Sequence, residues 1–207
     1  MTTVIETLSA ARIVPVIVID DAARAGDLAA ALVEGGIRAV EVTLRTAAGL
    51  DAMAAMAAHG GLTIGAGTVL TPEQVDSCAG AGAQFIVSPG VDDDVVARAQ
   101  ALGLGVLPGI ATATEVQRAL RAGLSDLKLF PADRLGGLAM IDSLTGPFPD
   151  VRFMPSGGVS AANAVEYLAH RSVFAISGSW MATRAAIAAG DFEAVRSASA
   201  AAIELVR

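Results

Sequence analysis

The sequence predicts a single (β/α)8 barrel that spans residues 1–207, and three observations support this fold. Short runs of β-branched and other apolar residues alternate with alanine-rich stretches along the whole chain. Eight such runs are present, and each is followed by a helical stretch, as in barrels of this class. The length of 207 residues suits one such domain, and no linker or change of composition marks a second. An open, doubly wound sheet is the main alternative, but it usually has fewer strands.

The strands are expected where short apolar runs end at turn-forming residues. They cover residues 13–19, 39–44, 63–66, 85–87, 105–107, 126–130, 152–154 and 173–176. Between them, apolar residues recur at helical spacing among alanines, which favour helix. The expected helices cover residues 22–34, 47–58, 72–81, 92–102, 114–122, 138–144, 161–168, 183–188 and 192–206, and a short helix is expected before the first strand.

The composition argues against several classes of partner. The net charge is −7, basic residues form no block and aromatic residues are few, so we expect no nucleic-acid partner. The longest apolar run, residues 13–19, is too short to cross a membrane, and no signal peptide is expected at the start of the chain. Cys78 is the single cysteine, which excludes an internal disulfide and fits the reducing cytoplasm.

Lys128 is the single lysine of the chain, beside thirteen arginines. Arginine stays protonated in proteins, whereas a desolvated lysine can lose its proton and become a nucleophile. Lys128 lies in a short apolar run that ends at Pro131, which indicates a buried strand. Codon bias can account for the ratio, but the position of Lys128 favours a chemical role.

Polar residues alternate with apolar ones along the second expected strand. Glu41, Thr43 and Arg45 share one face, and the apolar residues between them suit packing against helices. A carboxylate inside the barrel is costly unless it meets a positive partner or takes part in catalysis. The same alternation turns Lys128 and Asp126 inward. We therefore expect Glu41 to meet Lys128, either in catalysis or as a structural ion pair.

Glycine-containing loops follow several of the strands, where barrels place their active sites. Gly65 and Gly67 allow close approach of a ligand, and Thr68 offers a hydroxyl at the barrel mouth. The segments 88–90, with Pro89, and 108–110 are predicted to be turns that help to shape the pocket.

The loops after the last two strands indicate a phosphate site. Gly157 and Gly158 present bare backbone amides beside Ser156, and Ser179 adds a hydroxyl one strand later. Ser160 is expected to cap the helix that follows. Barrels of this class often bind phosphate with such loops and a helix N-terminus.

No metal or cofactor is expected. His59 and His170 both fall near predicted helix ends, where imidazole commonly interacts with the helix dipole. No dinucleotide-binding glycine pattern follows the first strand.

These motifs together resemble the 2-keto-3-deoxy-6-phosphogluconate (KDPG) aldolases, which are class I aldolases. The resemblance rests on residues 14–17, 40–46, 65–70, 88–90, 108–110, 128–132, 146–148, 157–160 and 178–180. It implies reversible cleavage of a phosphorylated keto sugar acid to pyruvate and glyceraldehyde 3-phosphate. Members are typically homotrimers and need no metal.

The resemblance also implies roles for single residues. Lys128 corresponds to the Schiff-base lysine and Glu41 to the acid/base, while Arg45 and Thr68 correspond to the groups that hold the substrate carboxylate. The phosphate would be held by Gly157, Gly158 and Ser179, with Pro89 and Ser156 as further substrate contacts.

Two departures from the family pattern stand near the site. Ser156 replaces a more common Thr and keeps the hydroxyl, whereas the segment 133–135 differs in sequence and can alter substrate preference.

Three alternatives stay open. A sibling aldolase would act on the galactonate epimer or on 4-hydroxy-2-oxoglutarate, although the segment 43–46 favours the gluconate type. A phosphate-binding isomerase or epimerase would use Glu41 as a base, with Lys128 in an electrostatic role. A non-catalytic phosphosugar-binding barrel leaves the convergence of Glu41, Arg45 and Lys128 unexplained.

Overall fold

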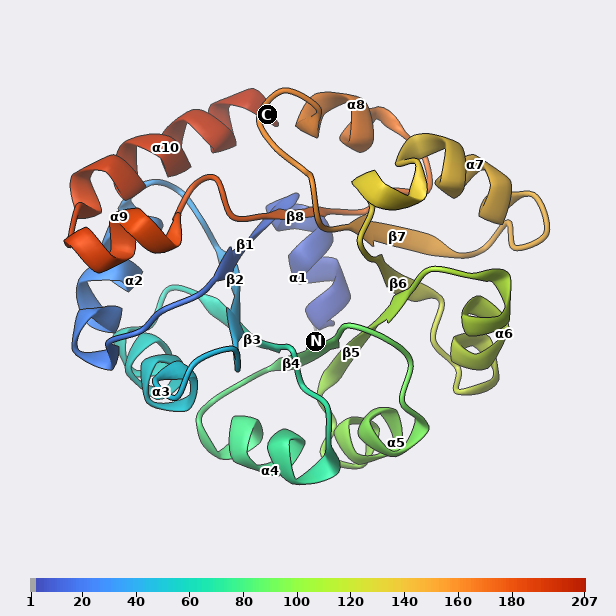
Figure 1. The fold of residues 1–207 in the computed structure, drawn as a ribbon, viewed down its shortest axis with the longest axis horizontal. Coiled ribbons are helices and arrows are strands. Elements are labelled where there is room, and N and C mark those ends of the chain that lie inside the picture. Colours follow the sequence, from blue (N-terminus) through green and yellow to red (C-terminus); the bar gives the residue numbers. More distant parts are fainter. Residues whose placement is uncertain (1–2) are drawn as a thin grey trace.

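The computed structural model describes residues 3–207, and in this part of the chain eight parallel strands form one sheet. The strands are β1 (Ile13–Ile17), β2 (Ala39–Thr43), β3 (Thr63–Gly67), β4 (Phe85–Ser88), β5 (Gly105–Ile110), β6 (Asp126–Leu129), β7 (Arg152–Pro155) and β8 (Ile176–Gly178). They follow the order β7-β6-β5-β4-β3-β2-β1-β8, and bridges from Phe153 to Val173 and from Ser156 to Ser177 bring the two end strands together. The predicted barrel is confirmed (Figure 1).

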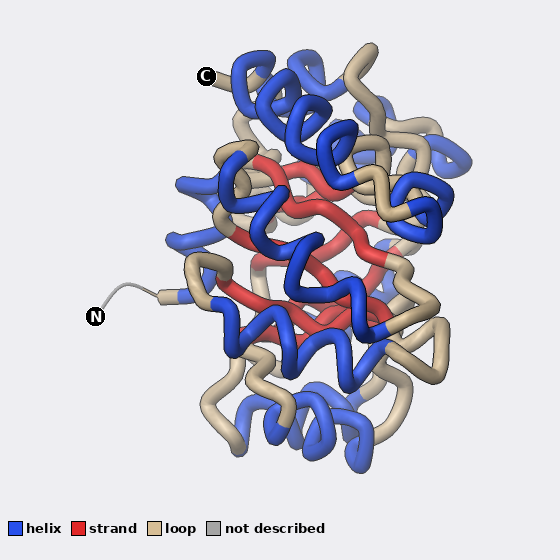
Figure 2. The backbone as a smooth tube through the Cα atoms, turned by 90° about the vertical axis from the view of Figure 1, so that its left-hand side faces the viewer, coloured by secondary structure: helices blue, strands red, loops and turns tan. Residues whose placement is uncertain are grey.

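Helices surround the strands, as Figures 1 and 2 show from two directions. They are α1 (Val4–Ala11), η1 (Ala22–Arg24), α2 (Ala25–Glu34), α3 (Gly49–His59), α4 (Pro72–Gly80), α5 (Asp93–Ala101), α6 (Ala113–Arg121), η2 (Asp133–Leu135), α7 (Leu138–Thr145), α8 (Ala164–Ala169), α9 (Arg184–Ala189) and α10 (Phe192–Leu205). The last helix packs on α2 and on α9. None of the helices within residues 3–207 is both long and apolar enough to cross a membrane.

The apolar residues form two cores, one outside the strands and one inside. Val40 and Val42 belong to the outer core, between β2 and the helices, as their alternation with Glu41 predicts. The inner core fills the lower barrel and includes Phe85 and Met154. The polar residues on the inward face, such as Glu41 and Lys128, therefore lie between this inner core and the carboxyl end of the barrel.

Helix α1 closes the amino-terminal end of the barrel. Thr3 and Glu6 form a capping box at its start, which satisfies two of the free backbone amides there. Leu8 joins the inner core, and Val4 lies against Gly105, the first residue of β5. Figure 1 shows α1 through the ring of strands. The open end of the barrel is thus the carboxyl end of the strands.

Two strands differ from the prediction by three residues at one end, and the other six differ by one or two residues. The last strand is Ile176–Gly178 and not residues 173–176, because Gly178 continues the extended chain and pairs with Pro15 of β1. Strand β5 continues through 108–110, which the sequence predicts to be a turn. Gly109 makes this possible, since a Cβ there would lie 2.2 Å from the backbone oxygen of Pro89.

Candidate active site

Lys128 and Glu41 meet inside the barrel. Strands β6 and β2, which carry them, lie on opposite sides of the ring in the strand order. Lys128 Nζ donates hydrogen bonds to Glu41 Oε1 at 2.9 Å and to Oε2 at 3.1 Å. The Lys128 side chain is 5% exposed and that of Glu41 is fully buried. The inward direction predicted for both residues is confirmed.

The polar neighbours of this pair have different positions. Thr43 donates its hydroxyl to the backbone oxygen of Ile17 at 2.9 Å and so ties β2 to β1. Asp126 lies at the start of β6, where it accepts a hydrogen bond from Arg152 Nε at 2.7 Å. Asp126 is therefore at the opposite end of the strand from the expected site.

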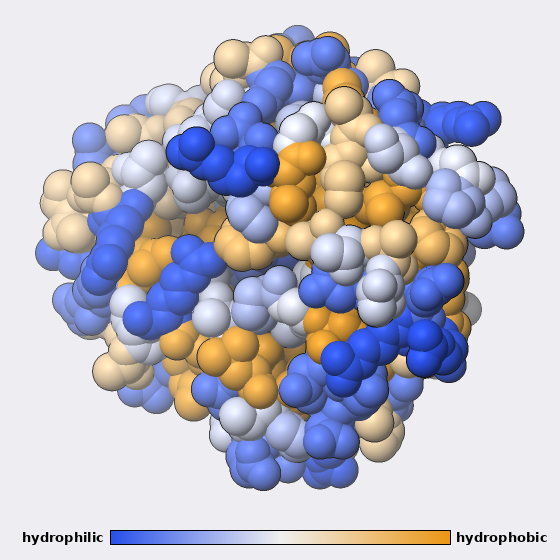
Figure 3. All heavy atoms as spheres, turned by 45° about the vertical axis from the view of Figure 1, so that its right-hand side comes forward, coloured by the Kyte–Doolittle hydropathy of each residue, from blue (hydrophilic) through white to orange (hydrophobic). Residues whose placement is uncertain are grey.

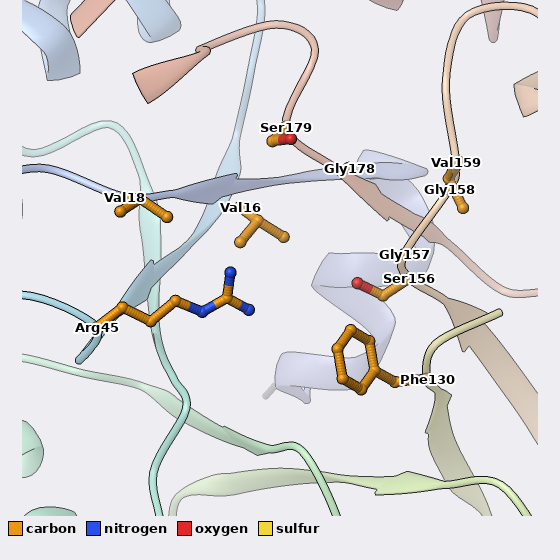
Figure 4. A pocket seen from close by; sticks show the side chains of 10 residues that line it. All are labelled: Val16, Val18, Arg45, Phe130, Ser156, Gly157, Gly158, Val159, Gly178 and Ser179. Atoms are coloured by element: carbon orange, nitrogen blue, oxygen red, sulfur yellow. The ribbon is translucent and has the colours of Figure 1, made fainter. Parts of the chain in front are cut away.

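Arg45 and Thr68 are joined at the barrel mouth. Arg45 lies in the turn after β2 and is exposed, and its Nε donates to Thr68 Oγ1 at 3.2 Å. Thr68 has a φ of 61°, in the left-handed region that β-branched residues rarely adopt. Such backbone conformations cluster at functional sites, where the surrounding structure maintains them. Figure 4 shows the guanidinium group of Arg45 pointing into the space between Val16 and Phe130.

A hollow of about 150 Å³ opens at this mouth. Its lining residues come from the ends of several strands and are Val16, Val18, Arg45, Phe130, Ser156, Gly157, Gly158, Val159, Gly178 and Ser179. Val16 is the register partner of Glu41, and the centre of the Phe130 ring is 5.4 Å from Lys128 Nζ. The buried ion pair therefore lies directly beneath the hollow.

The loop after β7 forms one wall of this hollow. Gly157 and Gly158 have φ angles of 89° and 82°, which glycine adopts without strain. Asn163 holds the loop, because its Oδ1 accepts from the Ser160 amide at 2.8 Å and its Nδ2 donates to the Gly158 oxygen at 3.0 Å. Ser179 faces the same hollow from the end of β8 (Figure 4).

The expectation that Ser160 caps a helix over residues 161–168 is wrong. Helix α8 begins at Ala164, with Asn163 as its N-cap residue. Bare glycine amides and the Ser179 hydroxyl thus remain as the groups that can hold an anion here. Asp133 packs against this loop, since a Cβ on Gly158 would lie 2.2 Å from Asp133 Cβ.

Other expected residues lie farther from the hollow. Pro89 lines a neighbouring hollow with Val69 and Leu70. His59 is the last residue of α3, with Nδ1 3.0 Å from the Gly60 oxygen, and the imidazole of His170 contacts Asp142 at 3.1 Å.

Phe130 is a pocket residue that the sequence reasoning did not assign. Its alternation with Lys128 was a usable signal, because both lie on the inward face of the same run.

Comparison with known proteins agrees with this geometry. The family model described as KDPG and KHG aldolase matches residues 4–198. The chain belongs to this family. A 2-dehydro-3-deoxy-phosphogluconate aldolase from Treponema pallidum is 46% identical over 207 residues, which cover 100% of this chain and 99% of the relative. The KHG/KDPG aldolase of Escherichia coli K12 is 41% identical over 198 residues, or 95% of this chain and 93% of the relative.

A solved structure from this aldolase family has the same fold. It is the KDPG aldolase of Legionella pneumophila with pyruvate captured at low pH as a covalent carbinolamine intermediate. The TM-score is 0.92 at 35% identity, and the match covers 97% of this chain and 98% of that one.

Proposed function

We propose that this aldolase-family chain is a class I lyase that cleaves 2-dehydro-3-deoxy-6-phosphogluconate reversibly to pyruvate and glyceraldehyde 3-phosphate. One observation carries the proposal, namely the buried contact of Lys128 Nζ with both oxygens of Glu41 beneath the mouth hollow. An amine that can become neutral beside a proton acceptor is what imine formation requires. The relatives named for this reaction, and the carbinolamine in the Legionella enzyme, support the same chemistry.

Imine formation begins at the buried pair. Glu41 accepts a proton from the Lys128 ammonium, and the neutral amine attacks the C2 ketone of the substrate. The new C–N bond gives a carbinolamine. Glu41 then donates a proton to the hydroxyl of the carbinolamine, which leaves as water. The product is a protonated imine, which withdraws electrons from C3.

Cleavage uses the same carboxylate. Glu41 accepts the proton of the C4 hydroxyl, directly or through a water, while the C3–C4 bond breaks and its electron pair moves toward the imine nitrogen. The aldehyde product leaves and an enamine remains. Glu41 then returns a proton to C3, and hydrolysis of the imine releases pyruvate and restores the Lys128 amine.

Substrate binding is assigned to the two sides of the hollow. Because Arg45 Nε donates a hydrogen bond to Thr68, the two terminal nitrogens of the guanidinium group are free to make a bidentate contact with the substrate carboxylate. That contact holds the ketone over Lys128. Amides of Gly157 and Gly158 and the Ser179 hydroxyl bind the phosphate at the other wall, and Ser156 faces the carbon chain between them.

Covalent trapping tests the mechanism. Borohydride reduction of a pyruvate-treated sample should give one adduct, which peptide mass spectrometry places on Lys128. Lys128→Arg should be inactive, since guanidinium does not lose its proton. Label elsewhere, or turnover at the wild-type rate in Lys128→Ala, contradicts the assignment. An isomerase that uses Lys128 only for its charge has no imine to reduce, so the same experiment separates the two reactions.

The identity of the proton acceptor needs its own variant. Glu41→Gln keeps the side-chain shape and removes the base, so kcat should fall by roughly 10²–10⁴-fold. Circular dichroism should show an unchanged fold. A Glu41→Gln enzyme with wild-type kcat would mean that another group moves the proton.

4-Hydroxy-2-oxoglutarate is a second candidate substrate, because the Escherichia coli relative is named for both reactions. Side-by-side kcat/KM values for this compound and for the gluconate and galactonate epimers decide the preference. We expect the gluconate substrate to rank first.

We also propose that the chain is one domain and forms a homotrimer in the cytoplasm, as the family resemblance implies. An apolar surface supports self-association, because Leu70 is 54% exposed beside the hollow lined by Val69, Pro89 and Val91. Figure 3 shows hydrophobic patches between hydrophilic residues on one face of the molecule. Light scattering coupled to size exclusion should give three times the chain mass, and Leu70→Glu should reduce it if this surface is the interface.

A further inference from the structure

We propose that Gly67 is a positioning residue for Glu41, because its bare α-carbon is the space in which the carboxylate lies. This inference rests on the acid/base role proposed for Glu41. Gly67 is the last residue of β3, beside β2, which carries Glu41. The absence of a side chain at Gly67 leaves the space that the Glu41 side chain occupies.

The geometry at Gly67 is close on three atoms of Glu41. A Cβ built on Gly67 would lie 2.3 Å from Glu41 Oε1, 2.6 Å from Cγ and 2.8 Å from Cδ. Real Cβ atoms essentially never come within 3.0 Å of such neighbours. The Glu41 side chain thus extends across the face of β3 directly over this α-carbon.

Backbone conformation does not explain this glycine. Gly67 is absent from the residues with positive φ in the described chain, so an L-residue would adopt its backbone angles without strain. It pairs regularly with Thr43 in the β2–β3 ladder. Space for the Glu41 side chain is therefore the physical requirement at this position.

Gly65 provides a matched control on the same strand and the same face. A Cβ there would lie 2.1 Å from Phe85 Cζ, in the inner apolar core and not in the site. An alanine at either position adds the same single methyl group to the barrel interior. The three nearest atoms to a Cβ at position 67 all belong to Glu41, whereas those at position 65 all belong to Phe85.

The consequence for the reaction follows from the distances. Moving Oε1 out of contact with a new methyl group requires a shift of roughly 1 Å, and a misplacement of that size can cost about 10²-fold in rate. The shift also breaks the paired hydrogen bonds of 2.9 and 3.1 Å to Lys128 Nζ. Arg45 and the loop after β7 do not contribute the clashing atoms, so we expect substrate binding to be retained.

A double-mutant cycle with full-length protein tests the inference. Gly67→Ala should lower kcat about 10²-fold with Glu41 present, while KM changes little. In the Glu41→Ala background the clashing atoms are gone, so the same substitution should leave the residual kcat almost unchanged. Gly65→Ala should lower thermal stability and alter kcat by the same factor in both backgrounds.

Each other outcome has a defined meaning. Equal effects of Gly67→Ala in the two backgrounds, or full activity of the single variant, would overturn the inference. If Gly67→Ala does not fold, folding of the double variant supports the steric account, and failure of both overturns it. A Glu41→Ala enzyme with wild-type kcat instead rejects the proposed acid/base role, while the coupling in thermal stability still reports on the contact.

Discussion

Lys128 and Glu41 reach each other from opposite sides of the barrel, and the ammonium group of Lys128 contacts both carboxylate oxygens of Glu41. Burial of two charges costs free energy, and their attraction offsets this cost only while both partners are present. With the catalytic roles proposed for both residues, the pair links stability to catalysis at one point of the fold.

Removal of one partner of this ion pair should lower the free energy of unfolding. Lys128→Met leaves an uncompensated buried carboxylate, so the free energy of unfolding should fall by about 3–5 kcal/mol. Addition of Glu41→Leu should recover most of this loss, because no buried charge remains. Urea unfolding at neutral pH measures both variants. A double variant no more stable than Lys128→Met contradicts the account.

Thr68 should show a conflict between stability and activity. Thr68→Gly removes the backbone strain of a φ of 61°, which is of order 1–3 kcal/mol. Glycine also makes the unfolded chain more flexible, which offsets part of this gain in stability. Its free energy of unfolding should equal or exceed that of the wild type. KM should rise, since Arg45 loses the hydroxyl that accepts its Nε–H.

Thr68→Ala is the matched control for this prediction. It also lacks the hydroxyl, but it keeps a Cβ in the left-handed region. We expect a similar KM and a free energy of unfolding about 1 kcal/mol below that of Thr68→Gly. Equal stability of the two variants would show that strain at residue 68 is negligible.

Ser179 should matter only for phosphorylated substrates. A hydrogen bond to a charged group contributes about 1.5–3 kcal/mol, so Ser179→Ala should raise KM for the phosphorylated substrate by about 10-fold or more. KM for 4-hydroxy-2-oxoglutarate should not change. Ser179→Thr keeps a hydroxyl and should restore part of the affinity. A rise in KM for both substrates would place Ser179 outside the phosphate site.

Cys78 should make stability decrease at alkaline pH. Burial raises the pKa of its thiol from 9.0 to about 11, since the thiolate is disfavoured away from water. The unfolded chain loses this proton first, so the contribution is complete below pH 9 and is lost as the pH rises toward 11. Urea unfolding from pH 8 to pH 11 should show this decrease relative to Cys78→Ala. Parallel curves would contradict it.

The pairing of Glu41 with Lys128 was predictable because it depends on local rules. A period of two fixes the face of each side chain, and the barrel brings the carboxyl ends of all strands to one rim. The reasons for the misplaced elements are not local. The extension of β5 depends on the Pro89 oxygen beside Gly109, and the shift of β8 depends on pairing with Pro15.

The same limit applies to the site. Asn163, and not Ser160, is the N-cap residue of α8, and its bonds to the loop after β7 depend on how the chain folds back on Gly158. The contact of Gly67 with Glu41 joins two strands and leaves no pattern in either sequence segment. Alternation predicts which residues face inward, whereas their mutual distances require the three-dimensional structure.

Helix α1 and the inner core around Leu8 and Phe85 block one end of the barrel. Substrate and products must therefore enter and leave at the carboxyl end of the strands. With the proposed roles, pyruvate is tethered to Lys128 at the back of this passage, and the phosphorylated aldehyde occupies the front. The aldehyde must depart first in cleavage, and pyruvate must arrive first in synthesis. The covalent imine fixes this order, and helix α1 leaves the carboxyl end of the strands as the shared route for both products.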